Sequence, residues 1–174
     1  MSIRISGGIY RSRRIECPSR GVRPTLDRVK EAIFSTLQMN IEGAEVLDLF
    51  AGSGNLGIEA LSRGALCATF VDKARICTKV IEKNLKTLGI LEKSGIITAD
   101  IRSYLKVCNR SFDLIFADPP YNKGLASQLA PHVYKLLNSG GILVLEHSPQ
   151  ELITIQSWKN RSYGDTMITY IQKD

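Results

Sequence analysis

Short apolar segments alternate with amphipathic segments from residue 45 to residue 146, and this alternation constrains the fold more than any other feature of the chain. The apolar segments predict strands at 45–50, 67–72, 95–99, 112–117 and 141–146, and the intervening segments predict helices at 56–63, 74–88, 101–107 and 124–137. Apolar strands that alternate with helices form a parallel sheet with helices on both faces. The sequence therefore predicts an α/β fold whose ligands lie beyond the carboxyl ends of the strands.

Two further segments flank the alternating region. The stretch "IRISGGIYRSRRIEC" predicts two short strands around Gly7-Gly8, and "RPTLDRVKEAIF" predicts a helix with Thr25 as its N-cap. At the other end, 152–158 and 166–172 predict two antiparallel strands around "NRSYG". A chain of 174 residues is of the size of one compact domain, which we divide into a basic extension at 1–40 and a main domain at 41–174.

Composition narrows the class of protein. No segment approaches the ~18 consecutive apolar residues of a membrane span, so we expect no membrane contact. The four cysteines are scattered without a C-x-x-C pair, which is typical of reduced thiols in a cytoplasmic protein. The two histidines, His132 and His147, are not at ligand spacing from a cysteine, and we expect no metal site.

The amino-terminal segment carries most of the positive charge. Residues 1–40 hold eight basic residues, seven of them arginine, against three acidic ones, while the net charge of the whole chain is +6. Arginine favours bidentate contacts to phosphate, so this segment predicts a surface that binds phosphate groups, with a solvated basic surface as the alternative. The candidate arginine contacts are Arg11, Arg13, Arg14 and Arg23.

A glycine-rich loop follows the first strand of the alternating region. In "VLDLFAGSGNLGIEAL" the residues Gly52, Gly54 and Gly57 match the pattern G-x-G-x-x-G, and Asp72 ends the next predicted strand. This pattern lets a ligand approach the backbone closely and is typical of nucleotide-cofactor sites, although a tight strand-to-helix turn also selects glycine.

Asp48 discriminates between cofactors. A dinucleotide would bring a pyrophosphate anion close to this carboxylate, and the two would repel each other. S-adenosylmethionine instead offers an ammonium group to Asp48, a ribose to Asp72 and an adenine amine to Asp100, with Ile101 packing on the ring. These residues therefore favour S-adenosylmethionine over a nicotinamide cofactor.

The stretch "FADPPYNKG" ends the strand at 112–117 with an acid, two prolines and a tyrosine. The prolines stiffen the backbone, so Asp118 and the carbonyl of Pro119 become fixed acceptors for the N–H groups of an aromatic amine. Asp118 can also take up the proton that methyl transfer releases, and Tyr121 can stack on the base. The catalytic candidates are therefore Asp118, Pro119, Pro120 and Tyr121.

With "RPTLDRVKEAIF" (23–34), "LDLFAGSGNLGIEALSRGA" (47–65) and "FADPPY" (116–121), the chain resembles the RsmD family nearly end to end. These are bacterial methyltransferases acting on guanine N2 of small-subunit ribosomal RNA. The resemblance implies a Rossmann-like class I methyltransferase fold, a seven-stranded sheet with one antiparallel strand. It also implies that 16S ribosomal RNA, in assembled or nearly assembled 30S subunits, is the partner of the basic segment.

The resemblance implies a role for each matching position. Asp118 to Tyr121 would hold the target amine, and Thr25 and Arg28 would lie at the rim of the active site. One position departs from the family, which more often has glutamate at Asp72 and a second acid where this chain has Ala74. The implied cofactor site consists of Asp48, Phe50, Gly52, Gly54, Asn55, Asp72, Asp100 and Ile101.

Three other functions stay open at this point. An adenine-N6 DNA methyltransferase would use the same Asp-Pro-Pro-Tyr motif, although this chain has no room for a separate DNA-recognition domain. A nicotinamide-dependent oxidoreductase leaves Asp48 and that motif unexplained. A non-catalytic RNA-binding module would need neither a methyl donor nor a rigid clamp for an amine.

Overall fold

The computed structural model describes residues 2–18, 27–121 and 124–174. The strands are β1 (Ser2–Arg4), β2 (Arg14–Glu16), β3 (Glu45–Leu49), β4 (Cys67–Asp72), β5 (Ser94–Thr98), β6 (Phe112–Ala117), β7 (Leu137–His147), β8 (Lys159–Tyr163) and β9 (Thr166–Gln172). The helices are α1 (Asp27–Thr36), α2 (Asn55–Ser62), α3 (Arg75–Leu88), α4 (Ile101–Val107) and α5 (Leu125–Lys135), with short 3-10 helices η1 (Gln38–Asn40) and η2 (Leu91–Lys93).

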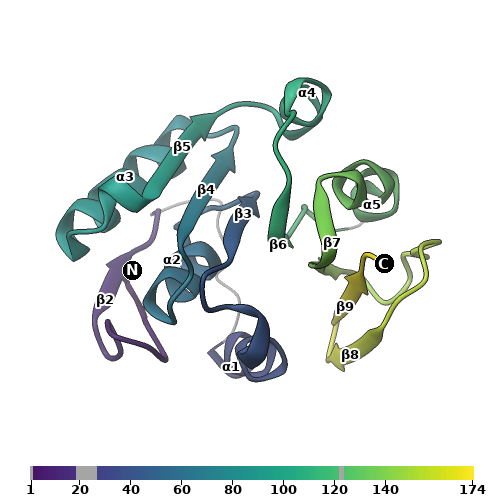
Figure 1. Cartoon of the computed structure of the whole chain (residues 1–174), viewed down its shortest axis with the longest axis horizontal. Coiled ribbons are helices and arrows are strands. Elements are labelled where there is room, and N and C mark those ends of the chain that lie inside the picture. The colour runs from purple at the N-terminus through teal and green to yellow at the C-terminus, as the bar shows by residue number, and fades with distance from the viewer. Residues whose placement is uncertain (1, 19–26, 122–123) are drawn as a thin grey trace.

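Seven strands form one sheet in the order β5-β4-β3-β6-β7-β9-β8. The pairings from β5 to β7 are parallel, whereas β9 is antiparallel to both β7 and β8. Helices α1, α2 and α3 cover one face, and α4 and α5 cover the other (Figure 1). The predicted α/β fold, with its single antiparallel strand, is confirmed.

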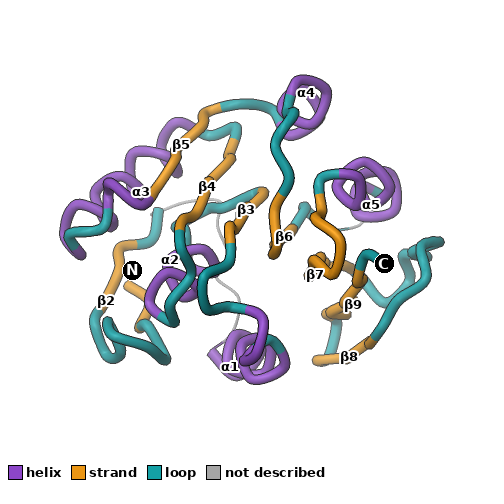
Figure 2. The backbone as a smooth tube through the Cα atoms, in the orientation of Figure 1, coloured by secondary structure: helices purple, strands orange, loops and turns teal. Residues whose placement is uncertain are grey.

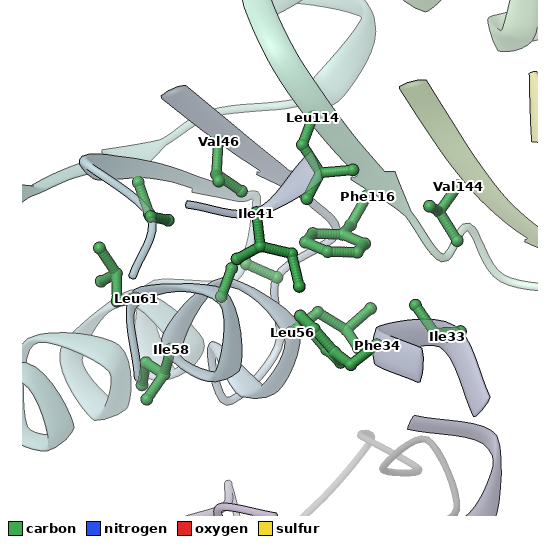
Figure 3. Close-up of a cluster of buried hydrophobic side chains, with 14 of the residues drawn as sticks. Ile33, Phe34, Ile41, Val46, Leu56, Ile58, Leu61, Leu114, Phe116 and Val144 are labelled. Atoms are coloured by element: carbon green, nitrogen blue, oxygen red, sulfur yellow. The ribbon is translucent and has the colours of Figure 1, made fainter. Parts of the chain in front are cut away.

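The core between the sheet and α1–α2 holds the site-bearing strands in place. The Phe34 ring of α1 lies 5.6 Å from the Phe116 ring of β6, centroid to centroid. Both residues are fully buried, and Ile58 of α2 and Val46 of β3 belong to the same apolar cluster (Figure 3). Burial of such side chains contributes roughly 1.5–3 kcal/mol each, so the strand ends that follow are firmly positioned.

The amino-terminal strands β1 and β2 form a separate antiparallel pair, as predicted. The connection is longer than a tight turn, because residues 5–13 and not Gly7-Gly8 alone separate the strands. This hairpin lies against α2 and α3 (Figure 2), where the backbone N–H of Ile9 donates to the carbonyl of Ser62 at 2.8 Å. The buried Asn84 of α3 also exchanges hydrogen bonds with the backbone of Glu16.

Of the two strands predicted at the carboxyl end, the one at 166–172 is confirmed and the one at 152–158 is wrong in its bounds. The strand expected at 152–158 lies at Lys159–Tyr163 instead, and it contains most of the predicted turn. Ile153 and Ile155 pack against the core cluster without belonging to a strand, which explains why this stretch is apolar. Because β8 is an edge strand with one solvated face, it needs little apolar character of its own.

The last parallel strand also begins earlier than predicted. The sequence predicts a helix to 137 and a strand at 141–146, but α5 ends at Lys135 and β7 runs from Leu137 to His147. The pairing of β6 with β7 shifts register between Phe112 and Leu114. A glycine with a φ of 75° at position 140 fits this irregularity, which the apolar pattern does not encode.

Gly57 allows α2 to lie close to the sheet, and Gly57→Ala should destabilise the protein. A Cβ at this position would lie 2.3 Å from Cε1 of Phe70 and 3.1 Å from Oδ2 of Asp48. Overpacking of this kind costs about 1–3 kcal/mol of the free energy of unfolding, which urea denaturation would measure. The control is Gly95→Ala in β5, whose Cβ would meet Thr69 at an ordinary 3.5 Å; equal losses of stability in both variants would contradict the explanation.

Candidate active site

The carboxyl ends of β3 and β6 bring two predicted site residues to one face of the sheet. In this parallel pair Asp48 is the partner of Phe116 and Leu49 is the partner of Ala117. Since side chains alternate between faces, Asp48 extends, like its neighbour Phe116, on the side covered by α1–α3, and Asp118 directly follows the last residue of β6. Their charges interact, because ionised Asp48 helps to raise the pKa of Asp118.

Asp48 is buried, with 3% of its surface exposed. Its Oδ2 atom accepts a hydrogen bond of 2.9 Å from the backbone N–H of Gly57 in α2. The pKa of Asp48 is raised from 3.8 to about 8: burial is the largest cause, the Gly57 hydrogen bond opposes it, and the charge of Asp72 adds to it. A carboxyl in this setting gains most from a ligand that brings a positive charge.

The glycine loop is held by Asp72 at the end of β4. The Oδ2 atom of Asp72 accepts from the N–H of Gly52 at 2.9 Å, and Oδ1 accepts from the N–H of Ala74 at 2.8 Å. Gly52 and Gly54 have φ values of 57° and 78°, in the left-handed region that glycine adopts without strain. One carboxylate oxygen thus orders the glycine loop and the other orders the turn before α3, so only their remaining lone pairs are left for a ribose.

Four predicted site residues line one pocket with a volume of about 200 Å³, and the other predicted cofactor residues do not line it. Asp100 and Ile101 come from the start of α4, where Oδ1 of Asp100 also caps the helix by accepting from the N–H groups of Arg102 and Ser103. The lining residues are Phe50, Lys73, Asp100, Ile101, Arg102, Pro120, Leu125 and Leu129.

Phe50 has a φ of 59°, although it is not a glycine. Left-handed backbone in a bulky residue is strained by on the order of 1–3 kcal/mol and persists where the surroundings impose it. The residue lies between β3 and the glycine loop and lines the pocket, so the strain falls at the turn that shapes this site.

The Asp-Pro-Pro-Tyr segment follows β6 as predicted. Asp118 is partly exposed, Pro119 is buried and Pro120 is exposed. Desolvation, followed by the charges of Glu146 and Asp48, raises the pKa of Asp118 well above 3.8. Once ionised, Asp118 is therefore a stronger proton acceptor than an ordinary surface carboxylate.

Tyr121 is anchored at its hydroxyl by two residues that the sequence analysis missed. The hydroxyl donates to Oε1 of Glu146 in β7, and it lies 2.8 Å from Oγ1 of Thr166 at the start of β9. Glu146 ends the strand predicted at 141–146, as Asp72 ends the strand predicted at 67–72, so the same pattern could have identified it. Thr166 belongs to the antiparallel strand, and no motif marks it.

The basic segment divides into surface and buried groups. Arg11, Arg13, Arg14 and Arg28 are exposed, whereas Arg23 and Thr25 lie outside the described residues. Arg13 donates to the carbonyl of Thr87 at the end of α3, and Arg14 donates to the Ser2 hydroxyl. Lys30 is wrongly counted with the RNA-facing charge, because it is fully buried and paired with Glu59 at 3.1 Å.

Within 2–18, 27–121 and 124–174, no three His, Cys, Asp or Glu side chains are grouped so as to hold a metal ion. Over the same ranges, no helix has the length and apolar character that crossing a membrane requires. All four cysteines are free thiols.

The strand order, the lone antiparallel strand, the glycine loop after β3 and the acids at the strand ends define a class I methyltransferase fold. A family model described as "Conserved hypothetical protein 95" matches residues 3–172. The chain belongs to this family, which is the RsmD family that its motifs resemble.

Known proteins agree with this assignment. The Escherichia coli K12 protein named "Ribosomal RNA small subunit methyltransferase D" is 42% identical over 130 residues, which cover 72% of this chain and 64% of that protein. This chain thus matches somewhat less than two thirds of that relative's length.

Solved structures share the fold. The structure titled "Putative methyltransferase yhhF from Escherichia coli" has a TM-score of 0.91 and 31% identity, covering 100% of this chain and 99% of that one. An RNA methyltransferase from Salinibacter ruber, solved in complex with S-adenosyl-L-homocysteine, has a TM-score of 0.68 at 15% identity and covers 86% of this chain and 93% of that one. At this identity the second likeness concerns the fold alone.

The raised pKa of Asp48 predicts that the ligand-free protein loses stability as the pH rises from 5 to 8. Over this range the folded state holds a proton that the unfolded state has released, so the free energy of unfolding falls, by at most about 1.4 kcal/mol per pH unit for one proton. Urea denaturation across this range should show a shallower decline in Asp48→Asn. An exposed control, Asp165→Asn, should keep the wild-type slope; an equally steep decline in Asp48→Asn would contradict the assignment.

Proposed function

We propose that this protein is a methyltransferase that uses S-adenosylmethionine to modify the exocyclic N2 amine of a guanine in 16S ribosomal RNA. The observation that carries the proposal is that Asp48 in β3 and Asp118 at the end of β6 lie close enough for their charges to interact, and each has a raised pKa. One acid is suited to a cationic cofactor group, and the other is suited to the N–H groups of the acceptor.

The cofactor site combines the glycine loop with the pocket. Asp48 would hold the ammonium group and Asp72 the ribose. The pocket, with Phe50, Asp100 and Ile101 in its lining, would take the adenine ring. Gly52, Gly54 and Asn55 complete this site. A methyltransferase that shares the fold was solved with S-adenosyl-L-homocysteine, so the fold is one that holds this class of cofactor.

Asp118 and Pro119 would act on the acceptor amine. An exocyclic amine is a weak nucleophile because its lone pair is delocalised into the ring, and acceptors fixed on its N–H bonds localise that pair on nitrogen. When bound, S-adenosylmethionine supplies an electrophilic methyl group on its sulfonium sulfur. Asp118 would take up the proton that the amine loses, and Pro120 would keep the clamp rigid.

Tyr121 would stack on the target base. Its ring is fixed at the far end by Glu146 and Thr166, so it offers a preorganised face. Stacking of this kind is worth about 1–3 kcal/mol per base. A base must leave its helix or already be unpaired to reach such a site.

Family membership and the name of the E. coli relative support ribosomal RNA as the substrate. Residues 1–40 would form the RNA-facing extension of the domain at 41–174, with Arg11, Arg13, Arg14, Arg23, Thr25 and Arg28 as its contacts. The substrate would be the 30S subunit or a late precursor of it, which places the activity in the cytoplasm.

The test is methylation with radiolabelled S-adenosylmethionine of three substrates: small subunits that lack the modification, naked 16S ribosomal RNA and duplex DNA. Label recovered as N2-methylguanosine from small-subunit RNA supports the proposal. Label recovered as N6-methyladenine from DNA, or no label in any of the three substrates, would overturn it.

Asp118→Asn should reduce methyl transfer to small subunits at least about 100-fold, because the amide is not a proton acceptor of comparable strength. Affinity for S-adenosylhomocysteine, measured by calorimetry, should stay within a few-fold, since Asp118 faces the acceptor. Asp165→Asn serves as the matched control at an exposed turn. Retained turnover in Asp118→Asn would remove this residue from catalysis.

Charge reversal at Arg11, Arg13 and Arg14 should weaken binding of 16S ribosomal RNA. It should also lower the slope of log affinity against log salt by about 0.7–0.9 for each phosphate that the variant no longer neutralises. Reversal of Lys93, Lys106 and Lys135, three exposed lysines outside the hairpin, produces the same change in net charge and is the control. Equal effects of the two sets would mean that the hairpin makes no specific contact with RNA.

A further inference from the structure

We propose that Lys30 is a positioning residue for the methyl-donor site and that it acts through the side-chain amide of Asn55. The inference rests on the proposed use of S-adenosylmethionine. It gives Lys30 a role in cofactor affinity rather than in RNA contact, although the residue lies in the basic amino-terminal segment.

Lys30 has no exposed surface and uses all three of its donor positions. Its Nζ atom donates to the carbonyl of Arg4 at 2.7 Å and to Oδ1 of Asn55 at 3.0 Å, and it lies 3.1 Å from Oε2 of Glu59. These partners come from the hairpin and from the first two turns of α2. A buried ammonium with three acceptors at these distances fixes the relative position of both elements.

The Glu59 carboxylate, the other charge of this ion pair, also accepts several hydrogen bonds. Glu59 accepts from the N–H and the hydroxyl of Ser6, from the N–H of Gly7 and from Nε of Arg63, at 2.8–2.9 Å. Burial alone would raise the pKa of Glu59, but Lys30 and the Ser6 hydrogen bonds bring it below its ordinary value. Hydrogen bonds therefore offset the cost of burying both charges of this ion pair. Through Glu59 they also connect α2 to the hairpin next to Lys30.

Asn55 links this network to the cofactor site. It is the first residue of α2 and directly follows Gly54 of the glycine loop. Because its Oδ1 atom accepts from Lys30, the amide orientation is set, and the amide nitrogen is left as the donor for other groups. This nitrogen is buried and has no hydrogen-bond partner among the described residues.

A buried donor without a partner costs about 1–3 kcal/mol, and a ligand acceptor that pairs with it recovers this cost. The amino-acid end of S-adenosylmethionine carries a carboxylate beside its ammonium group. Asp48, which accepts from Gly57 two residues further along α2, suits the ammonium. Lys30 and the amide of Asn55 supply the complementary positive side, so the groups from β3 and α1 that bond to the first turn of α2, together with Asn55, match both charges of this end.

The test is a double-mutant cycle on S-adenosylhomocysteine affinity, measured by calorimetry on the full chain. Lys30→Met and Asn55→Ala should each weaken binding about tenfold, and the double variant should be no weaker than Asn55→Ala alone, because Lys30 acts through Asn55. Lys86→Met, which removes an exposed lysine paired with Glu82 on α3, is the control and should bind as the wild type does.

A purely structural role predicts a different result. In that case Lys30→Met would lower the melting temperature while the affinity stayed within twofold, or the two substitutions would weaken binding additively; either outcome overturns the proposal. In methylation assays the KM for the donor should rise while the KM for the small subunit stays unchanged. A change confined to the small-subunit KM would also overturn it, since it would make Lys30 an RNA contact.

Folding and the proposed function are controlled separately. If Lys30→Met does not fold, Lys30→Met/Glu59→Gln removes both charges of the pair and enters the same cycle. If wild-type protein fails to bind S-adenosylhomocysteine at all, the proposed function fails. If wild-type protein binds and the Lys30 variants bind equally well, only this inference fails.

Discussion

The in-register pairing of β3 with β6 is the constraint on which the site depends. It brings Asp48 close to Asp118, which directly follows β6, so the two carboxyls interact with each other, Asp48 also with Asp72 and Asp118 also with Glu146. Concentrating acids in a poorly solvated place costs free energy, as the raised pKa values of Asp48 and Asp118 indicate. Backbone N–H groups and the Tyr121 hydroxyl donate to these carboxylates, and bound protons neutralise part of their charge. A positively charged ligand would neutralise the rest.

The amino-terminal hairpin is connected to the glycine loop by hydrogen bonds of buried side chains. Asn84 bonds to the backbone of Glu16 in the hairpin and also to the carbonyl of Ser53 in the glycine loop. Lys30 joins the hairpin to Asn55 on the other side of that loop. The segment that carries the arginines is therefore connected at two points to the loop proposed to hold the cofactor, and it is not an independent arm.

The sequence predicted the parallel part of the fold well, because buried parallel strands are apolar throughout and helices between them are amphipathic. The strand at 67–72, the strand at 112–117 and the helix at 101–107 have the bounds that the pattern predicts. The prediction at 152–158 is wrong because apolar character does not by itself specify strand pairing. The apolar residues of this stretch pack on the core without pairing, whereas the polar stretch that follows forms the edge strand β8.

Within the site, the sequence identified residues that are marked by a motif and missed those defined by tertiary contact. Asp118 and the glycine loop are recognisable by their spacing, whereas Thr166 meets Tyr121 only because β9 turns back beside β7.

Lys30 is the clearest example of a residue whose role depends on tertiary contact. A lysine among seven arginines is counted as surface charge, and nothing local says that Glu59, 29 positions away, will bury it. Charge counting along a chain treats every cation as a contact for phosphate, but a cation that has exchanged its water for a buried carboxylate is no longer available to one. The electrostatic footprint of the amino-terminal segment is therefore that of its exposed arginines, and the lysine acts in the interior.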